Sequence, residues 1–129
     1  MFNNKNNSKD ELLELIHLMP AGVQNFLKGF KDIHECYEIV LDLGYAPQIR
    51  YHKTIAETDE TSDNISFDSW VQCLDLDLPK ITQLDIDRAV KMIGDFNSDN
   101  RAGINGTLHR ISCIRNRQQK IIGLTCRVG

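Results

Sequence analysis

The chain has 129 residues, of which 41% are hydrophobic and 26% charged, and its formal net charge is −3. This length and composition are those of one globular domain with a modest core, so we expect residues 1–129 to form a single domain with residues 1–8 disordered. No apolar run approaches the roughly 20 residues that a membrane-spanning helix requires, and no signal-peptide pattern opens the sequence.

The first part of the chain predicts two helices. Ser8 and Glu11 have the spacing of a capping box, which places the start of the first helix at Ser8. Pro20 interrupts this helix and suits the first turn of a second, shorter one. Both helices carry an apolar stripe that is typical of packing on a core: Leu12, Leu13, Leu15, Ile16 and Met19 in the first, and Val23, Phe26, Leu27 and Phe30 in the second.

Alternating apolar residues then predict three strands. In residues 37–43 the alternation places Glu38 and Asp42 opposite an apolar face made of Tyr37, Ile39, Leu41 and Leu43. Gly44 and Tyr45 form a turn into a return strand at 46–51, where Pro47 belongs at the start or on an edge. Residues 54–64 are acidic and rich in turn formers, which predicts a mobile loop, and a third strand follows at 70–76.

The clearest helix is predicted at residues 83–93. Thr82 and Asp85 have the spacing of a capping box, and Gly94 stands where a left-handed stop would fall. We expect one buried stripe on this helix, formed by Leu84, Ile86, Ala89, Val90 and Ile93.

Two further alternating runs flank a polar turn at 115–119 and predict a β-hairpin. A turn centred on Gln118 and Gln119 places Ile111 opposite Cys126, so that the two apolar faces coincide: His109, Ile111 and Cys113 on one strand, and Ile122, Leu124, Cys126 and Val128 on the other. The same register opposes Arg110 and Arg127, which is mildly destabilising and favours a negative group nearby. The predicted fold is α+β, an antiparallel sheet of about five strands with the N-terminal helices and one further helix packed on one face.

Charge is distributed unevenly along the chain. From Asp99 onward there are six Lys/Arg and one Asp, a formal +5, whereas residues 1–98 carry nine Lys/Arg and seventeen Asp/Glu, a formal −8. One interpretation is a solvated cationic strand balanced by acidic helices. The other is a hairpin that faces an anion, either a phosphate or a nucleic acid backbone.

The sequence carries no recognisable catalytic or metal-binding motif. The four cysteines have no CxxC pair and no zinc-type spacing with histidine, and we interpret them as reduced thiols of an intracellular protein. Asp75 and Asp77 share a face but lack a third ligand nearby, and His109 is interpreted as a packed structural residue. P-loop, HExxH and nucleophile-elbow patterns are absent, so no catalytic residue, metal or cofactor is predicted for this chain alone.

Several segments resemble a known family. They are NRAGINGTLHRISCIRNRQQKIIGLTCRVG in residues 100–129, EIVLDLGYAPQIRY in 38–51, LDIDRAVKMIGDF in 84–96 and, more weakly, LMP in 18–20. Together they resemble the hypothetical chloroplast open reading frame 45 family, which comprises P-loop ATPases of cyanobacteria and plastids. A more distant similarity is to the amino-terminal domains of a sporulation ATPase and of type IV secretion and pilus ATPases. Residues 67–78 and the preceding loop depart from the family pattern by their greater length.

The resemblance implies a non-catalytic amino-terminal accessory domain of a ring-forming ATPase, in the plastid stroma or the cyanobacterial cytoplasm. In the family an ATPase core follows the position of Gly129, and these 129 residues contain no P-loop, so ATP and Mg²⁺ are expected only with such a core, in cis or in trans. In the distant secretion ATPases, arginines of the amino-terminal domain reach the nucleotide across a domain junction. By that resemblance Arg110 and Arg127, together with Arg101, would face the nucleotide phosphates.

A second functional hypothesis is a small nucleic-acid-binding module. It would use the cationic hairpin, including Arg115, Arg117 and Lys120. The negative net charge and the lack of exposed aromatic residues on the hairpin count against it. A homo-oligomer is a further partner hypothesis.

Overall fold

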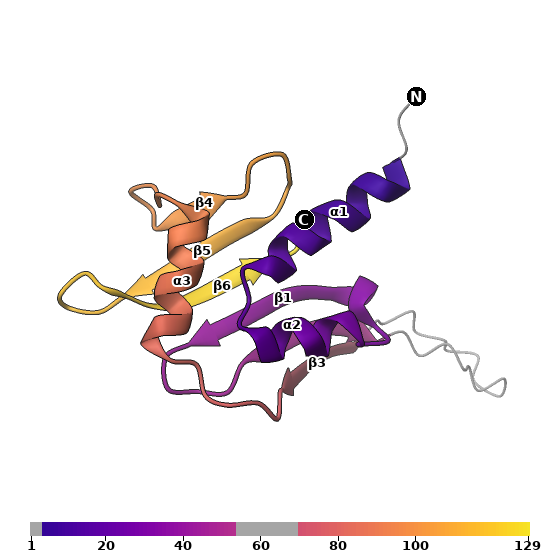
Figure 1. Cartoon of the computed structure of the whole chain (residues 1–129), viewed down its shortest axis with the longest axis horizontal. Coiled ribbons are helices and arrows are strands. Elements are labelled where there is room, and N and C mark those ends of the chain that lie inside the picture. Colours follow the sequence, from indigo (N-terminus) through magenta and orange to yellow (C-terminus); the bar gives the residue numbers. More distant parts are fainter. Residues whose placement is uncertain (1–3, 54–69) are drawn as a thin grey trace, which may run out of the picture.

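The structure is a computed structural model that describes residues 4–53 and 70–129, with the backbone alone for 4–10 and 70. Within these ranges three α-helices pack on a six-stranded antiparallel sheet of order β3-β2-β1-β6-β5-β4 (Figure 1). The elements are α1 (Asn4–His17), α2 (Ala21–Lys28), a 3₁₀ turn (Ile33–Glu35), β1 (Cys36–Asp42), β2 (Gln48–Lys53), β3 (Trp70–Asp75), α3 (Gln83–Ile93), β4 (Arg101–Gly103), β5 (Arg110–Arg115) and β6 (Ile121–Arg127). The predicted α+β class is confirmed. The sixth strand is β4, whose three residues are too few to produce an alternating pattern.

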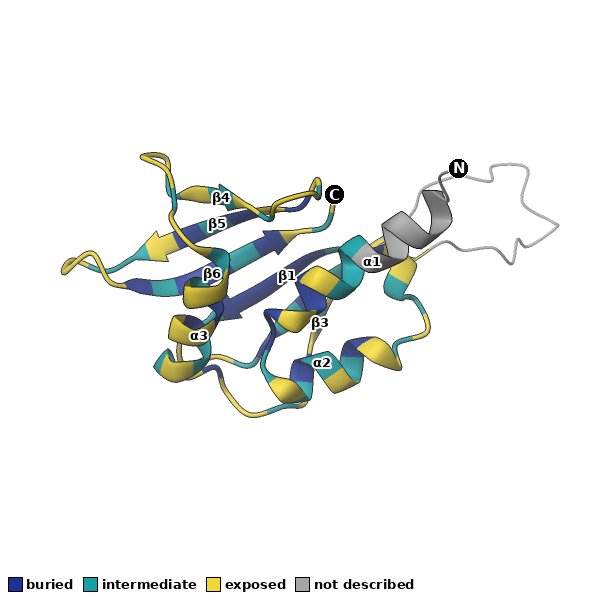
Figure 2. Cartoon of the chain, turned by 45° about the horizontal axis from the view of Figure 1, so that its top comes forward, coloured by how far each residue is buried: buried dark blue, intermediate teal, exposed yellow. Residues whose placement is uncertain are grey.

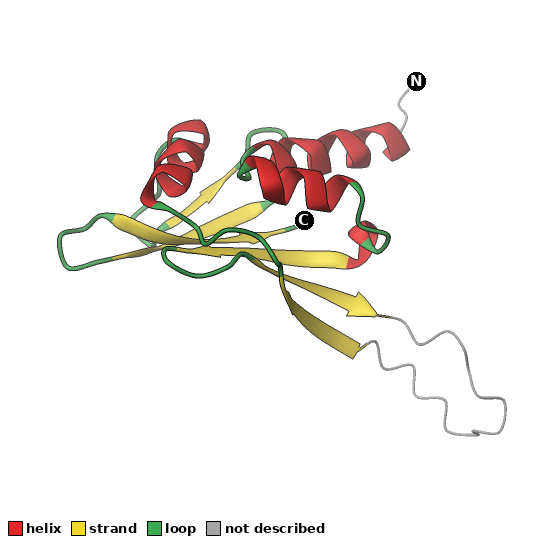
Figure 3. Ribbon diagram, turned by 60° about the horizontal axis from the view of Figure 1, so that its bottom comes forward, coloured by secondary structure: helices red, strands yellow, loops and turns green. Residues whose placement is uncertain are grey.

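All three helices lie on one face of the sheet, and no described helix or loop covers the other, which we call the open face (Figure 3). The core lies between these layers and is formed by apolar side chains from α1, α2, α3 and the four strands β2, β1, β6 and β5 (Figure 2). Its largest fully buried side chains are Leu15, Met19, Leu27, Ile39, Leu41, Ile49, Ile86, Ile111 and Leu124. No helix of the described ranges is both long and apolar enough to cross a membrane. The loop predicted at 54–64 and the first three of the residues predicted to be disordered lie outside the described residues.

The hairpin register is confirmed. Ile111 pairs with Cys126 and Arg110 pairs with Arg127, and the first pair is buried against the helices. The face assignment is wrong at the start of β6, where Ile121 is buried and Ile122 is only half-buried. The pairing shifts by one residue between Ile114 and Arg115, and such a bulge reverses the alternation beyond it. Val128, predicted to be buried, is half-buried at the edge of the core.

The predicted face assignment is also wrong at the start of β1, where there is a second bulge. The register to β2 shifts between Cys36 and Glu38, so that Cys36 enters the core. Tyr37 instead stacks on His52, with ring centroids 4.6 Å apart. Leu43, predicted to share the apolar face, lies beyond the end of β1 and is 37% exposed. Bulges are set by local pairing and leave no trace in a simple alternation count.

The helices differ from prediction in two places. Helix α1 begins at Asn4, one turn before the predicted start at Ser8, because the preceding polar residues include no glycine or proline that would break it. Residues 4–8, predicted to be disordered, therefore lie in a helix. Helix α3 has the predicted bounds and the capping box of Thr82 and Asp85, but Leu84 is 76% exposed. At 100° per residue Leu84 lies opposite the buried Ile86 and Ala89.

One buried histidine links α1 to the end of the sheet. His109 is 3% exposed, and its Nε2 lies 2.7 Å from the carbonyl oxygen of Glu11 in α1. Its Nδ1 accepts a hydrogen bond of 3.0 Å from the amide of Gly129, just beyond β6. Since Nδ1 accepts, Nε2 must carry the proton and donate to Glu11. The interpretation of His109 as a structural residue is confirmed.

Replacing His109 by leucine should lower the free energy of unfolding by about 2 kcal/mol, because the amide of Gly129 loses its acceptor and α1 loses a donor. The measurement is the midpoint of urea unfolding. His17→Leu is the matched control, since His17 is exposed at the end of α1, and it should change stability by less than about 0.5 kcal/mol. Equal effects of the two substitutions would contradict the role assigned to His109.

Candidate functional site

The open face of the sheet carries a row of charged residues across its central strands. The register places Arg110 of β5 opposite Arg127 of β6, Arg127 opposite Glu38 of β1, and Glu38 opposite Arg50 of β2. These residues occupy the open face because their strand neighbours, such as Ile111 and Cys126, must face the helices. A cationic surface therefore follows from the same alternation that builds the core.

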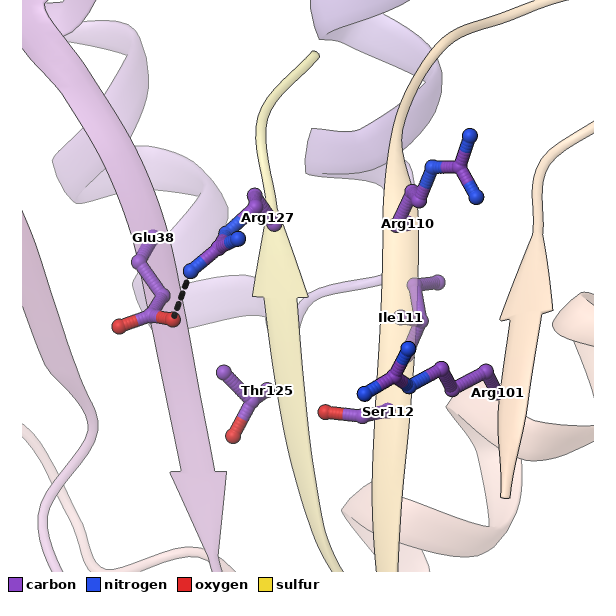
Figure 4. Close-up of a pocket in the computed structure, with 7 residues that line it drawn as sticks. All are labelled: Glu38, Arg101, Arg110, Ile111, Ser112, Thr125 and Arg127. Atoms are coloured by element: carbon purple, nitrogen blue, oxygen red, sulfur yellow. Dashed lines mark ion pairs between the residues drawn. The ribbon is translucent and has the colours of Figure 1, made fainter. Parts of the chain in front are cut away.

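Three arginines of this face line one hollow of about 210 Å³. Its complete lining is Glu38, Arg101, Arg110, Ile111, Ser112, Thr125 and Arg127, and we call it the arginine hollow (Figure 4). Arg101 comes from the short edge strand β4, where it pairs with Ser112 of β5. The structure thus brings together the three residues that the family resemblance singled out, from three adjacent strands.

The three guanidinium groups surround the hollow rather than meeting in it. Arg127 leans toward Glu38, Arg101 extends over β5 to Ser112, and Arg110 turns away from Arg127 (Figure 4). The divergence separates the two like charges that the register opposes. Ser112 and Thr125, paired across β5 and β6, add two hydroxyl groups to the floor.

Glu38 is the one carboxylate in the lining of the hollow, and it is 7% exposed. Its Oε1 accepts a hydrogen bond of 2.6 Å from Nη1 of Arg50, a short charge-assisted contact. Its Oε2 lies 3.9 Å from Nη2 of Arg127, which is an ion pair without a hydrogen bond. The negative group expected near the opposed arginines is therefore part of the chain, and it leaves the donors of Arg127 available.

The other three predicted cations lie at the opposite end of the hairpin. Arg115 donates to Asn100 Oδ1 at 2.9 Å and to the carbonyl oxygen of Gln119 at 2.8 Å, so it holds the turn. Lys120 lies 3.9 Å from Asp87 of α3. Arg117 is exposed at the tip of the turn. Arg115 lies five residues after Arg110 along β5, about 17 Å away, so this group and the arginine hollow are separate sites.

The cysteines do not contribute to the hollow. All four are free, and only Cys73 is exposed. Burial raises the pKa of Cys36 to about 11 and that of Cys126 to about 12, and burial also raises the pKa of Cys113. These three thiols stay protonated at neutral pH and behave as small hydrophobic groups. Among the described residues no three His, Cys, Asp or Glu side chains gather as metal ligands would.

The sequence did not identify Glu38, Arg50, Ser112 or Thr125 as functional residues, although the alternation of the hairpin did place Ser112 on the face of Arg110 and Thr125 on the face of Arg127. The alternation of β1 did place Glu38 opposite the apolar face. What it could not give is the pairing of β1 with β6, which sets Glu38 beside Arg127. To predict that Glu38 lies beside Arg127, one would need pairing information between residues almost 90 positions apart.

Chemically, the arginine hollow offers the kinds of donor that oxyanions accept from. Guanidinium groups present paired N–H donors that match phosphate oxygens, and hydroxyl groups can add further donors. The lining contains no aromatic side chain on which a nucleobase could stack. The geometry therefore suits a phosphate group better than a base or an apolar ligand.

Three known proteins are similar to this chain over almost all of its length. They are the uncharacterized protein ycf45 of Porphyra purpurea (38% identical over 93% of the chain), the protein SEEDLING PLASTID DEVELOPMENT 1 of Arabidopsis thaliana (37% over 92%) and the uncharacterized protein ycf45 of Cyanidium caldarium (38% over 93%). The chain spans 18%, 15% and 30% of the length of these relatives, respectively. No protein-family model matches the chain, and neither does any solved structure.

Neutralising one of the opposed arginines should stabilise the domain at low ionic strength. For Arg110→Gln we expect a gain of about 0.5 kcal/mol in the free energy of unfolding, because like charges directly opposite repel. The gain should disappear in about 1 M salt, where the screening length falls to about 3 Å. The measurement is urea unfolding at two salt concentrations, with Arg117→Gln as the control. A gain that persists in high salt would contradict the electrostatic cause.

Proposed function

We propose that this chain, related over most of its length to the ycf45 proteins, is a non-catalytic accessory domain of a plastid or cyanobacterial P-loop ATPase. Its arginine hollow would meet the phosphates of a nucleotide that an adjoining ATPase core holds. The observation that carries the proposal is the presence of Arg101, Arg110 and Arg127 in the lining of one hollow.

Charge and geometry support phosphate as the ligand. The lining holds three arginines and one carboxylate, and that carboxylate makes its shortest contact with Arg50, outside the hollow. Bound phosphate would relieve the repulsion between Arg110 and Arg127, and its oxygens can accept forked hydrogen bonds from both. The arginines would stabilise the ligand most where negative charge develops on its oxygens in the transition state of phosphoryl transfer.

The need for a core follows from what binds nucleotides tightly. Such sites usually cradle phosphates with consecutive backbone amides at a helix N-terminus or a Gly-rich loop, together with a lysine and Mg²⁺. The arginine hollow offers side-chain cations on strands. The relatives are several times longer than this chain, so they have room for a separate core. The name of the Arabidopsis relative refers to plastids, and we extend a plastid location to this chain.

Binding to a nucleic acid backbone is the second candidate. The observation in its favour is that six cations lie in residues 101–127. Two of the three cations at the turn have partners within the chain, however, since Arg115 makes two hydrogen bonds and Lys120 lies near Asp87. The arginine hollow is therefore the stronger basis for a function.

Because the hollow lacks an amide cradle, the 129-residue chain should bind ATP with a dissociation constant no better than about 1 mM, or roughly 4 kcal/mol. It should show no ATP hydrolysis above a buffer blank. Chemical-shift titration of the backbone amides measures the affinity and reports which strands respond. Micromolar binding or measurable turnover would contradict the assignment as an accessory domain.

In a version of the protein that carries the ATPase core, Arg110→Ala and Arg127→Ala should each reduce ATP hydrolysis at least tenfold. Tenfold corresponds to about 1.4 kcal/mol of lost transition-state stabilisation. Arg117→Ala is the matched control, since it removes an exposed cation of the same hairpin outside the hollow, and it should have little effect.

The same variants should be tested for binding to single-stranded nucleic acid at two salt concentrations. If the hairpin binds a nucleic acid backbone, each lost cation, including Arg117, should weaken binding and reduce the dependence on log salt by about one phosphate contact.

Equal effects of Arg110→Ala, Arg127→Ala and Arg117→Ala on ATP hydrolysis would contradict the proposal that the hollow meets the nucleotide at a domain junction.

A further inference from the structure

Glu38 occupies an unusual place for a carboxylate. It lies on β1 in the middle of the sheet, between two arginines of neighbouring strands, and its side chain is 9% exposed. It also lines the arginine hollow, so an anion that enters the hollow approaches a negative charge of the protein (Figure 4). A site that binds anions strongly would be better served by a neutral residue here.

The two oxygens of Glu38 are engaged unequally. Arg50 holds Oε1 at 2.6 Å, whereas Arg127 is 3.9 Å from Oε2 and its side chain is 69% exposed. Arg127 is therefore attracted to Glu38 but makes no hydrogen bond with it. A ligand must compete with Glu38 for Arg127, and a phosphate with several oxygens can do so through forked hydrogen bonds.

Ligand charge then decides whether the competition succeeds. Every small anion loses a similar amount of translational and rotational freedom on binding, whatever its charge. Glu38 lowers the positive potential in the hollow and so reduces the attraction per unit of ligand charge. A singly charged anion gains too little to offset the fixed cost, and a ligand with several charges can exceed it.

We propose that Glu38 weakens the arginine hollow, so that the hollow holds polyphosphate chains weakly and singly charged anions not measurably, without recognition of a nucleobase. This inference rests on the proposed function and names the part of the nucleotide that the hollow recognises. The lining supplies cations and hydroxyl groups to a phosphate chain, and it offers no aromatic side chain to a base.

The test is a chemical-shift titration of the 129-residue chain with inorganic triphosphate, ATP, GTP and acetate. The wild type should bind triphosphate, ATP and GTP with similar millimolar constants and acetate not measurably. Glu38→Gln keeps an acceptor for Arg50 and removes the charge, so triphosphate should bind about tenfold more tightly. Arg50→Gln should act in the opposite direction, about threefold weaker, because Glu38 would then turn fully to Arg127.

Asp42→Asn is the matched control. Asp42 lies on the same strand and the same face, four residues from Glu38, and does not line the hollow. At about 13 Å along the strand it is beyond the screening length, so triphosphate affinity should stay within about twofold of the wild type.

The possible outcomes separate this inference from the proposed function. If neither the wild type nor Glu38→Gln binds triphosphate, the proposed phosphate site is wrong. If the wild type binds and Glu38→Gln binds equally or more weakly, Glu38 merely orients Arg127 and the inference is overturned. A clear preference for ATP over both triphosphate and GTP would overturn the absence of base recognition.

Discussion

The pairing of β1 with β6 is the interaction on which the rest of the structure depends. It joins residues 38–42 to residues 123–127 at the centre of the sheet, with Ile39 opposite Cys126 and Leu41 opposite Leu124. These four side chains are almost fully buried beneath the helices. The other four strands lie on either side of this pair: β2 and β3 extend the sheet beyond β1, and β5 and β4 extend it beyond β6.

The core also determines which residues lie on the charged face, because successive side chains of a strand point to opposite faces of the sheet. Burying an aliphatic side chain such as Ile111 or Leu124 is worth about 1.5–3 kcal/mol. Opposing two arginines costs on the order of 0.2–1 kcal/mol. Hydrophobic burial therefore wins, and Arg110 and Arg127 stay opposed on the open face. Glu38 reduces the resulting repulsion from the next strand.

Much of this could be predicted from the sequence where local signals are strong. The bounds and caps of α3, the hairpin register and the place of Arg110 and Arg127 on one face all follow from patterns within about twenty residues. Errors arose where a bulge changed the alternation, at Tyr37 and at Ile121, since bulges depend on pairing partners. The hollow itself joins three strands and β1, and the place of Glu38 beside Arg127 in its lining follows only from the long-range pairing of β1 with β6.

The strand order has a consequence for how the chain folds. Strand β6 comes last of the six in sequence and yet lies between β1 and β5 at the centre. Until β6 is synthesised, one edge of β1 has no partner, and an unpaired apolar edge invites association with other chains. Pairings of such long sequence separation also close slowly. Folding during synthesis should therefore pass through a vulnerable stage that ends only when residues 121–127 dock, and chaperone dependence is expected to concentrate there.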